Sequence, residues 1–127
     1  MSTEQDIQQL FADWNAALCS GDPEAVTRLY AEDAILLPTV SNKMRHNREQ
    51  IRDYFRHFLA RRPMGRIDES HVRLFGELAI HSGHYTFTFG SSDRDPVQAS
   101  FTFVYRHESE KRWRIVSHHS SALPEAE

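Results

Sequence analysis

Cysteine is almost missing from this 127-residue sequence, in which Cys19 is the single example. One cysteine excludes an internal disulfide and any zinc site built from thiolates. Basic residues are also in the minority, because 15 lysines and arginines face 18 aspartates and glutamates, for a formal charge of −3. The concentrated positive charge of nucleic-acid-binding proteins is therefore not expected, and we predict no nucleic-acid partner.

Long hydrophobic runs are absent as well. No stretch of about 18 consecutive apolar residues occurs, so no membrane-spanning helix and no membrane partner are expected. The N-terminal MSTEQD is polar and acidic, unlike a secretory signal, and the cytoplasm is the expected location. Hydrophobic residues still make up 39% of the chain, which is enough for one folded domain, expected over residues 1–127.

Several motifs that would define a catalytic site are missing. The eight histidines form no HxH, HxxxH or HExxH spacing, so a histidine zinc site could come only from residues distant in sequence. No glycine-rich phosphate loop occurs, and no GxSxG elbow surrounds Ser120 or Ser121. We therefore expect no metal and no other cofactor, and the two serines are weak candidates for a nucleophile.

The first half of the chain has the apolar spacing of helices. Apolar residues recur every three or four positions near the N-terminus, which predicts an amphipathic helix that ends at Gly21. Asp22 and Pro23 are typical of the start of a second, short helix. A brief strand is expected at 34–37, followed by a polar loop and a third helix at about 48–60.

After residue 66 the apolar period falls to two. This change predicts strands at about 67–75, 78–89, 97–106 and 112–121. Helices followed by antiparallel strands indicate an α+β fold, in which the N-terminal helices pack on one face of a curved, mostly antiparallel sheet. A pocket between the helices and the concave face of the sheet is the expected ligand site.

Two sets of side chains alternate along the last predicted strand. One set holds Trp113, Ile115, Ser117, His119 and Ser121. Its two large apolar members make it the core-facing set, so His119 and Ser121 are expected to point into the pocket. His118 and Ser120 belong to the opposite set, and the two adjacent histidines therefore cannot bind one metal together.

The outward set predicts an interface. It combines Val104 and Val116 with Arg106, Arg114 and His118, a mixture of apolar and polar side chains that is typical of protein–protein contacts. We therefore expect a homodimer formed through the outer face of the sheet.

Tyr54 is the other candidate site residue that the pattern indicates. It lies one turn from Ile51 and from Phe58, on the apolar side of the third predicted helix. Its phenol needs a polar partner there, and a hydroxyl or an imidazole across the pocket would provide one. The same pattern fits a purely structural role, with Tyr54 as a core aromatic and His119 as a buried histidine that is satisfied by its neighbours.

The motifs resemble known families. The order of elements and the closing pattern W-x-I-x-x-H-H-S-S resemble the cone-shaped, nuclear-transport-factor-two-like superfamily. Within it, the chain is similar to the branch that contains the association domain of calcium/calmodulin-dependent kinase II. Five stretches together resemble iota-class carbonic anhydrases of the metal-free type: LLPTVSN (36–42), DYFRHFL (53–59), SGHYTFTF (82–89), FTFVYR (101–106) and HHSSALP (118–124).

The resemblance to iota-class carbonic anhydrases implies the reversible hydration of CO₂ to bicarbonate without a metal. In that family a threonine, a tyrosine, a histidine and a serine line the bicarbonate pocket, and by motif these are Thr39, Tyr54, His119 and Ser121. Our hypothesis is that Tyr54 and Ser121 orient the attacking water, His119 carries the proton, and Thr39 binds a carboxylate oxygen. The partners implied are CO₂ and bicarbonate.

Two other classes of function stay open. The superfamily also contains noncatalytic modules for oligomerisation or small-ligand binding, and a fold alone does not decide between them. It contains isomerases and hydratases that act on small organic substrates as well. Such enzymes usually place a carboxylate or histidine base in the pocket, and no carboxylate is expected on the inward faces of the third helix and the last strand.

Overall fold

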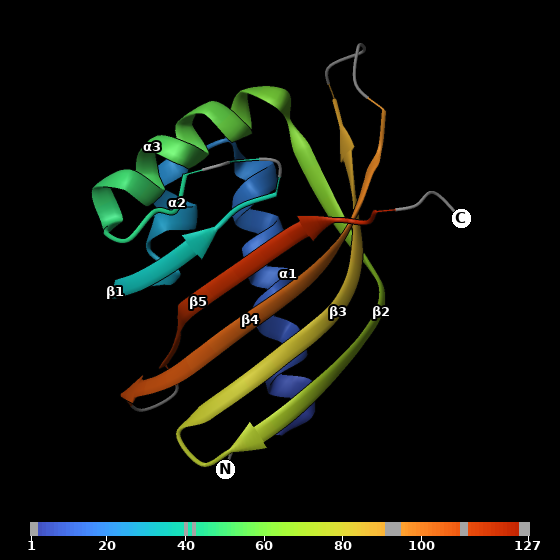
Figure 1. The fold of residues 1–127 in the computed structure, drawn as a ribbon. Helices are drawn as coiled ribbons and strands as arrows, with labels where there is room; N and C mark the ends of the chain where they lie inside the picture. Colours follow the sequence, from blue (N-terminus) through green and yellow to red (C-terminus); the bar gives the residue numbers. More distant parts are fainter. Residues whose placement is uncertain (1–2, 40, 42, 91–94, 110–111, 125–127) are drawn as a thin grey trace.

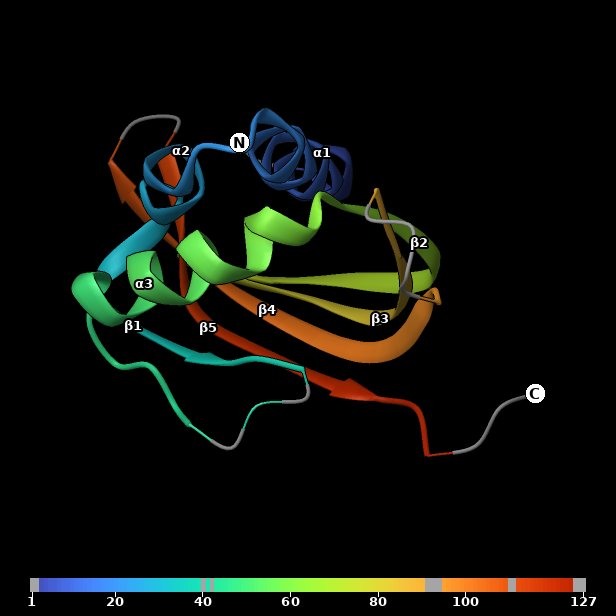
Figure 2. The ribbon, with the colours of Figure 1, turned by 90° about the horizontal axis from the view of Figure 1, so that it is seen from above.

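The computed structural model describes residues 3–39, 41, 43–90, 95–109 and 112–124. It confirms the α+β prediction: three α-helices cover one face of a curved five-stranded sheet (Figures 1 and 2). The elements are α1 (Glu4–Ser20), α2 (Pro23–Thr27), β1 (Tyr30–Leu37), α3 (Arg48–Phe58), a 3₁₀ turn (Leu59–Arg61), β2 (Pro63–Phe75), β3 (Leu78–Phe89), β4 (Val97–Ser109) and β5 (Arg112–Ala122). No described helix has the length and apolar character needed to cross a membrane.

The ends of the first two helices follow from local chemistry. Thr3 and Asp6 form a reciprocal capping box at the start of α1, with nitrogen–oxygen distances of 2.8 and 3.3 Å. Gly21 ends α1 with a φ of 77°, a left-handed conformation that glycine adopts without steric cost. Asp22 then caps α2, and Pro23 fills its first turn. The predicted helix boundaries here are confirmed.

The sheet has the strand order β1-β5-β4-β3-β2. Among the strands that the structure describes, only the β1–β5 pair is parallel, which confirms the mostly antiparallel prediction. The strand predicted at 34–37 begins earlier, at Tyr30, and the strand predicted at 67–75 begins at Pro63. The added residues matter because Tyr30 is completely buried beneath the helices and reaches the centre of the molecule.

An irregularity in β5 reverses the expected orientation of its final residues. Tyr105 of β4 pairs with Ile115, but the preceding Val104 pairs with Ser117, so Val116 is an extra residue in the ladder. Such a bulge breaks the two-residue alternation and turns every later side chain to the opposite face. Ile115 and His118, three positions apart, are both buried as a result.

The prediction that His119 and Ser121 point into the pocket is therefore wrong. His118 and Ser120 lie on the concave face, with only 3% and 5% of their surfaces exposed. His119 and Ser121 are exposed on the outer face of the sheet, where a 2.9 Å hydrogen bond joins them. The expectation that the two histidines face opposite ways is confirmed.

Candidate functional site

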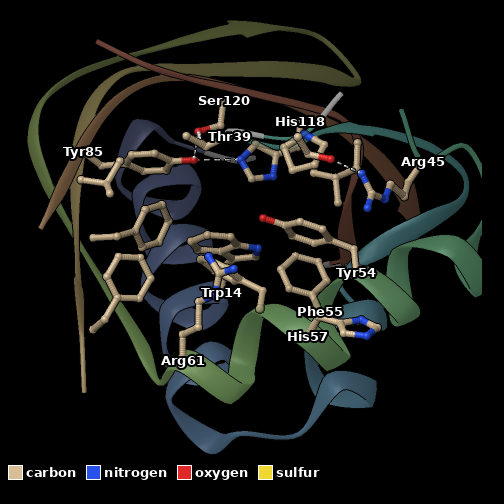
Figure 3. Close-up of a pocket in the computed structure, with 17 residues that line it drawn as sticks. Trp14, Thr39, Arg45, Tyr54, Phe55, His57, Arg61, Tyr85, His118 and Ser120 are labelled. Carbon is tan, nitrogen blue, oxygen red and sulfur yellow. Dashed lines mark hydrogen bonds between the residues drawn. The ribbon is translucent and has the colours of Figure 1, made fainter. Parts of the chain in front are cut away.

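A cavity of about 450 Å³ lies between α3 and the concave face of the sheet (Figure 3). Apolar and aromatic side chains form much of its wall, with a few polar groups directed inward, as is typical of ligand pockets. The lining residues are Trp14, Leu36, Pro38, Thr39, Ser41, Arg45, Tyr54, Phe55, His57, Phe58, Arg61, Tyr85, Phe87, Phe89, Val97, His118 and Ser120. Two of the four residues predicted for the site, Thr39 and Tyr54, are in this set.

Thr39 reaches the cavity because β1 runs parallel to β5. Leu36 and Leu37 pair with His118 and His119, so the chain that leaves β1 passes beside Ser120. The Thr39 and Ser120 hydroxyls contact each other directly. A hydroxyl both donates and accepts, so this pair can bind either a water molecule or an anion oxygen.

Tyr54 stands on the inner side of α3, as predicted. Its ring stacks on Phe58 with centroids 5.6 Å apart, and the Arg45 guanidinium lies 5.0 Å from its centroid. Its hydroxyl points into the cavity from the side opposite His118 (Figure 3). Burial raises the pKa of Tyr54 to about 12, so the phenol keeps its proton at neutral pH.

His118 is held at both ring nitrogens. Nδ1 lies 2.8 Å from the Tyr30 hydroxyl, and Nε2 lies 3.2 Å from the Tyr85 hydroxyl. The imidazole stacks on Phe103 with centroids 4.0 Å apart. Burial, with a smaller contribution from the nearby His119, lowers the pKa of His118 to about 3. The ring is therefore neutral near pH 7 and is a poor proton acceptor.

Tyr85 is a site residue that the sequence analysis missed. It is buried on β3, and its hydroxyl donates a 2.8 Å hydrogen bond to the Ser120 hydroxyl (Figure 3). Burial raises its pKa far above the usual value. The signal was present, because Tyr85 alternates with Phe87 in SGHYTFTF, and a buried tyrosine beside a phenylalanine requires a polar partner.

The remaining polar residues of the lining are cationic or neutral. Arg45, Arg61 and His57 contribute to it, and no aspartate or glutamate does among the residues that the structure describes. His57 is exposed, as expected, and its Nδ1 lies 2.9 Å from the Asp53 carbonyl oxygen. A carbonyl only accepts, so Nδ1 carries the proton and Nε2 of a neutral ring is left with a lone pair. The pocket thus favours a small anion over a cation.

Metal ligation has no obvious position in the described part of the chain. No three side chains of histidine, cysteine, aspartate or glutamate come close enough there to hold a metal ion. His118, the buried histidine of the lining, has both ring nitrogens hydrogen-bonded to tyrosine hydroxyls.

Comparison with known proteins gives the family. The family model described as the calcium/calmodulin dependent protein kinase II association domain matches residues 3–124. The chain belongs to this family. A crystal structure from Xanthomonas campestris, assigned to the same domain, shares 45% identity at a TM-score of 0.92, covering 99% of this chain and 91% of that one. No curated protein matches the chain.

More distant solved structures show the wider fold. A candidate dehydratase of the NTF2-like family from Streptomyces avermitilis has 16% identity and a TM-score of 0.85, with 95% and 96% of the two chains covered. A candidate ketosteroid isomerase from Parabacteroides distasonis has 22% identity and a TM-score of 0.72, with 93% and 86% covered. These likenesses confirm the nuclear-transport-factor-two-like fold, a fold that hosts several reactions and therefore fixes none.

Proposed function

We propose that this protein catalyses the reversible hydration of CO₂ to bicarbonate, without a metal. The observation that carries the proposal is the convergence of Thr39, Tyr54, His118 and Ser120 on one cavity. All four agree with the sequence resemblance in residue type. Thr39 and Tyr54 stand at the positions first assigned, and the histidine and the serine each lie one position earlier than alternation indicated. The absence of a carboxylate from the described lining counts against a carboxylate-based isomerase or hydratase.

The pocket offers separate places for the two reactants. Phe58, Phe87 and Val97 form an apolar wall suited to uncharged CO₂. The Tyr54 hydroxyl holds the attacking water, and the Ser120 and Thr39 hydroxyls face the oxygen that becomes negative. As the water oxygen bonds to the carbon of CO₂, one C=O electron pair moves onto the CO₂ oxygen that faces Ser120 and Thr39, and the water gives up one proton. Donors aimed at developing charge are a major source of rate enhancement.

The proton leaves through His57 in this proposal. His118 is unsuited to the task because its pKa is about 3, whereas the exposed His57 has an available Nε2 lone pair at the cavity. The proton passes from the attacking water to Nε2 through further water molecules, and then to the buffer. Arg45 and Arg61 favour retention of bicarbonate until it is released.

A stopped-flow assay of CO₂ hydration tests the proposal. The protein is treated with EDTA, and its metal content is measured by elemental analysis. We expect catalysis above the buffer rate with less than stoichiometric metal. Activity that disappears with the chelator and returns with zinc would contradict the metal-free reaction, and the absence of any catalysis would contradict CO₂ hydration itself.

The size of the cavity favours a second candidate, a noncatalytic module that binds a small ligand. About 450 Å³ lies within the range of pockets for organic ligands and is large for CO₂ alone. Its aromatic wall and the Arg45 and Arg61 side chains would fit a small carboxylic acid with an apolar body. Saturable binding of such an acid by a protein that shows no hydration activity would favour this candidate.

Homodimer formation through the outer face of the sheet is also part of our proposal. Val116 packs partly on the core and His118 points inward, so the face differs from the one first expected. Ile35 and Leu37 on β1 are instead exposed at 39% and 38%, and they pair in register with Ser117 and His119. A monomer mass in light scattering at micromolar protein would contradict the dimer.

A further inference from the structure

A continuous chain of hydrogen bonds runs from the core to the cavity. It begins at the Trp14 indole, whose Nε1 lies 3.2 Å from the Tyr30 hydroxyl, and it continues from Tyr30 to Nδ1 of His118 at 2.8 Å. From Nε2 of His118 it passes to Tyr85 at 3.2 Å, and from Tyr85 to Ser120 at 2.8 Å. The last link joins Ser120 to Thr39 at the cavity surface.

The direction of this chain is set at its buried end. The indole N–H is a donor only, so the Tyr30 oxygen accepts from Trp14 and its own proton needs another acceptor. Tyr30 is completely buried, and Nδ1 of His118 is the acceptor that the described residues provide. If Nδ1 carried the proton instead, the buried Tyr30 O–H would be left without an acceptor, which is unfavourable away from water.

The other end of the imidazole leads to the same assignment. Tyr85 has one proton and donates it to Ser120. It must therefore accept from His118, so Nε2 carries the ring proton. Each group then donates to the next, so Ser120 donates to Thr39, and the Thr39 hydroxyl proton is left available at the cavity.

We propose that Trp14 and Tyr30 are positioning residues that fix His118 as its Nε2–H tautomer, so that the chain ends with the Thr39 hydroxyl as a donor to the cavity and selects a small anion. Tyr30 is absent from the cavity lining, so it acts through His118 rather than on the ligand. The inference deepens the proposed function and rests on it only for the identity of the anion, bicarbonate.

Tyr30→Phe breaks the chain at the link that fixes its direction. Without the Tyr30 hydroxyl, either nitrogen of His118 can carry the proton, and Tyr85 can donate to Nε2 instead of to Ser120. Tyr105→Phe is the matched control, because Tyr105 is another buried tyrosine and its hydroxyl has no hydrogen-bond partner among the described residues.

Nitrogen-15 NMR of histidine-labelled protein reads the tautomer directly, with the His118 signals assigned by their loss in His118→Gln. In the wild-type protein near pH 7 we expect a neutral ring protonated at Nε2, which needs no variant to observe. A ring protonated at Nδ1, or a cationic ring, would overturn the proposal. Tyr30→Phe should give a mixture of the two tautomers, and Tyr105→Phe should give the wild-type signals.

Titrations with sodium bicarbonate and with sodium formate supply the ligand readout. We expect Tyr30→Phe to weaken binding of the anion about tenfold, the scale of one misdirected charge-assisted hydrogen bond, and Tyr105→Phe to change it less than about twofold. Equal binding by the wild-type protein and a folded Tyr30→Phe variant would refute the proposal. Formate binding that depends on Tyr30, in a protein without CO₂ hydration, would leave this proposal standing and would refute the proposed function.

Discussion

Buried His118 should make the protein sensitive to mild acid. Its ring has a pKa of about 3 in the folded protein, against 6.5 as its ordinary value, because burial disfavours the cation. Between these two values the unfolded chain binds a proton that the folded chain does not, so acidification favours unfolding and the contribution is recovered as the pH rises. Each pH unit inside this window is worth about 1.4 kcal/mol.

The perturbation is a change from about pH 7 to about pH 4.5, applied to the wild-type protein and to His118→Gln. Protonation of His118 in the unfolded chain should lower the free energy of unfolding by about 2.5 kcal/mol over this interval. This is less than the full value of about 1.4 kcal/mol per pH unit, because the unfolded histidine is only partly protonated near pH 7. Glutamine does not titrate, so the variant should lose less stability over the same interval, although it starts from a lower value. His81, whose pKa is also lowered by burial, is present in both proteins and cancels in the comparison.

Urea unfolding at the two pH values, followed by circular dichroism, measures the difference. The free energy of unfolding comes from linear extrapolation, and unchanged slopes with denaturant show that the same unfolding is compared. Equal losses of stability in the two proteins would mean that His118 is already protonated, or accessible to water, in the folded state. His118 would then again be a candidate for the proton acceptor in the reaction.

Three further predictions concern activity. Tyr54→Phe should lower kcat/KM for CO₂ hydration about tenfold or more, because it removes only the hydroxyl that points into the cavity; an unchanged value would exclude this phenol from the reaction. Ser120→Ala should cause a similar loss while Ser121→Ala stays within about twofold, and the reverse order would restore the original strand phase. His57→Ala should slow turnover in dilute buffer and be rescued by added imidazole, whereas His46→Ala, outside the cavity lining, should behave as wild type in the same stopped-flow assay.

The helices and the position of the pocket were accessible from the sequence because they depend on local signals. The threonine cap, the glycine stop and the apolar stripe of α1 act within a few residues of each other. Tyr54 was located by the same helical spacing. Each of these features has one physical cause that lies within a single element, so no knowledge of the partner strands was needed.

The wrong predictions concern features that depend on the pairing between strands. Alternation carried His119 and Ser121 to the wrong face because the extra residue, Val116, is defined only by the pairing of β5 with β4. Likewise, the roles of Tyr30 and Tyr85 depend on hydrogen bonds between residues 88 and 33 positions apart. Membership of the calcium/calmodulin dependent protein kinase II association domain family was inferred correctly, since it rested on the order of elements and on the closing tryptophan, histidine and serine pattern rather than on the phase of one strand.

The doubled letters of HHSS give the end of β5 an unusual tolerance to misalignment. If β5 lost the bulge and its register shifted by one residue, His119 and Ser121 would replace His118 and Ser120 on the concave face. If Val116 were deleted, a regular ladder would again direct His118 and Ser120 inward. Both outcomes place an imidazole and a hydroxyl, two residues apart, in the cavity. The composition of the cavity is therefore insensitive to a one-residue shift of the strand, whereas a site with a single histidine and a single serine would lose both side chains.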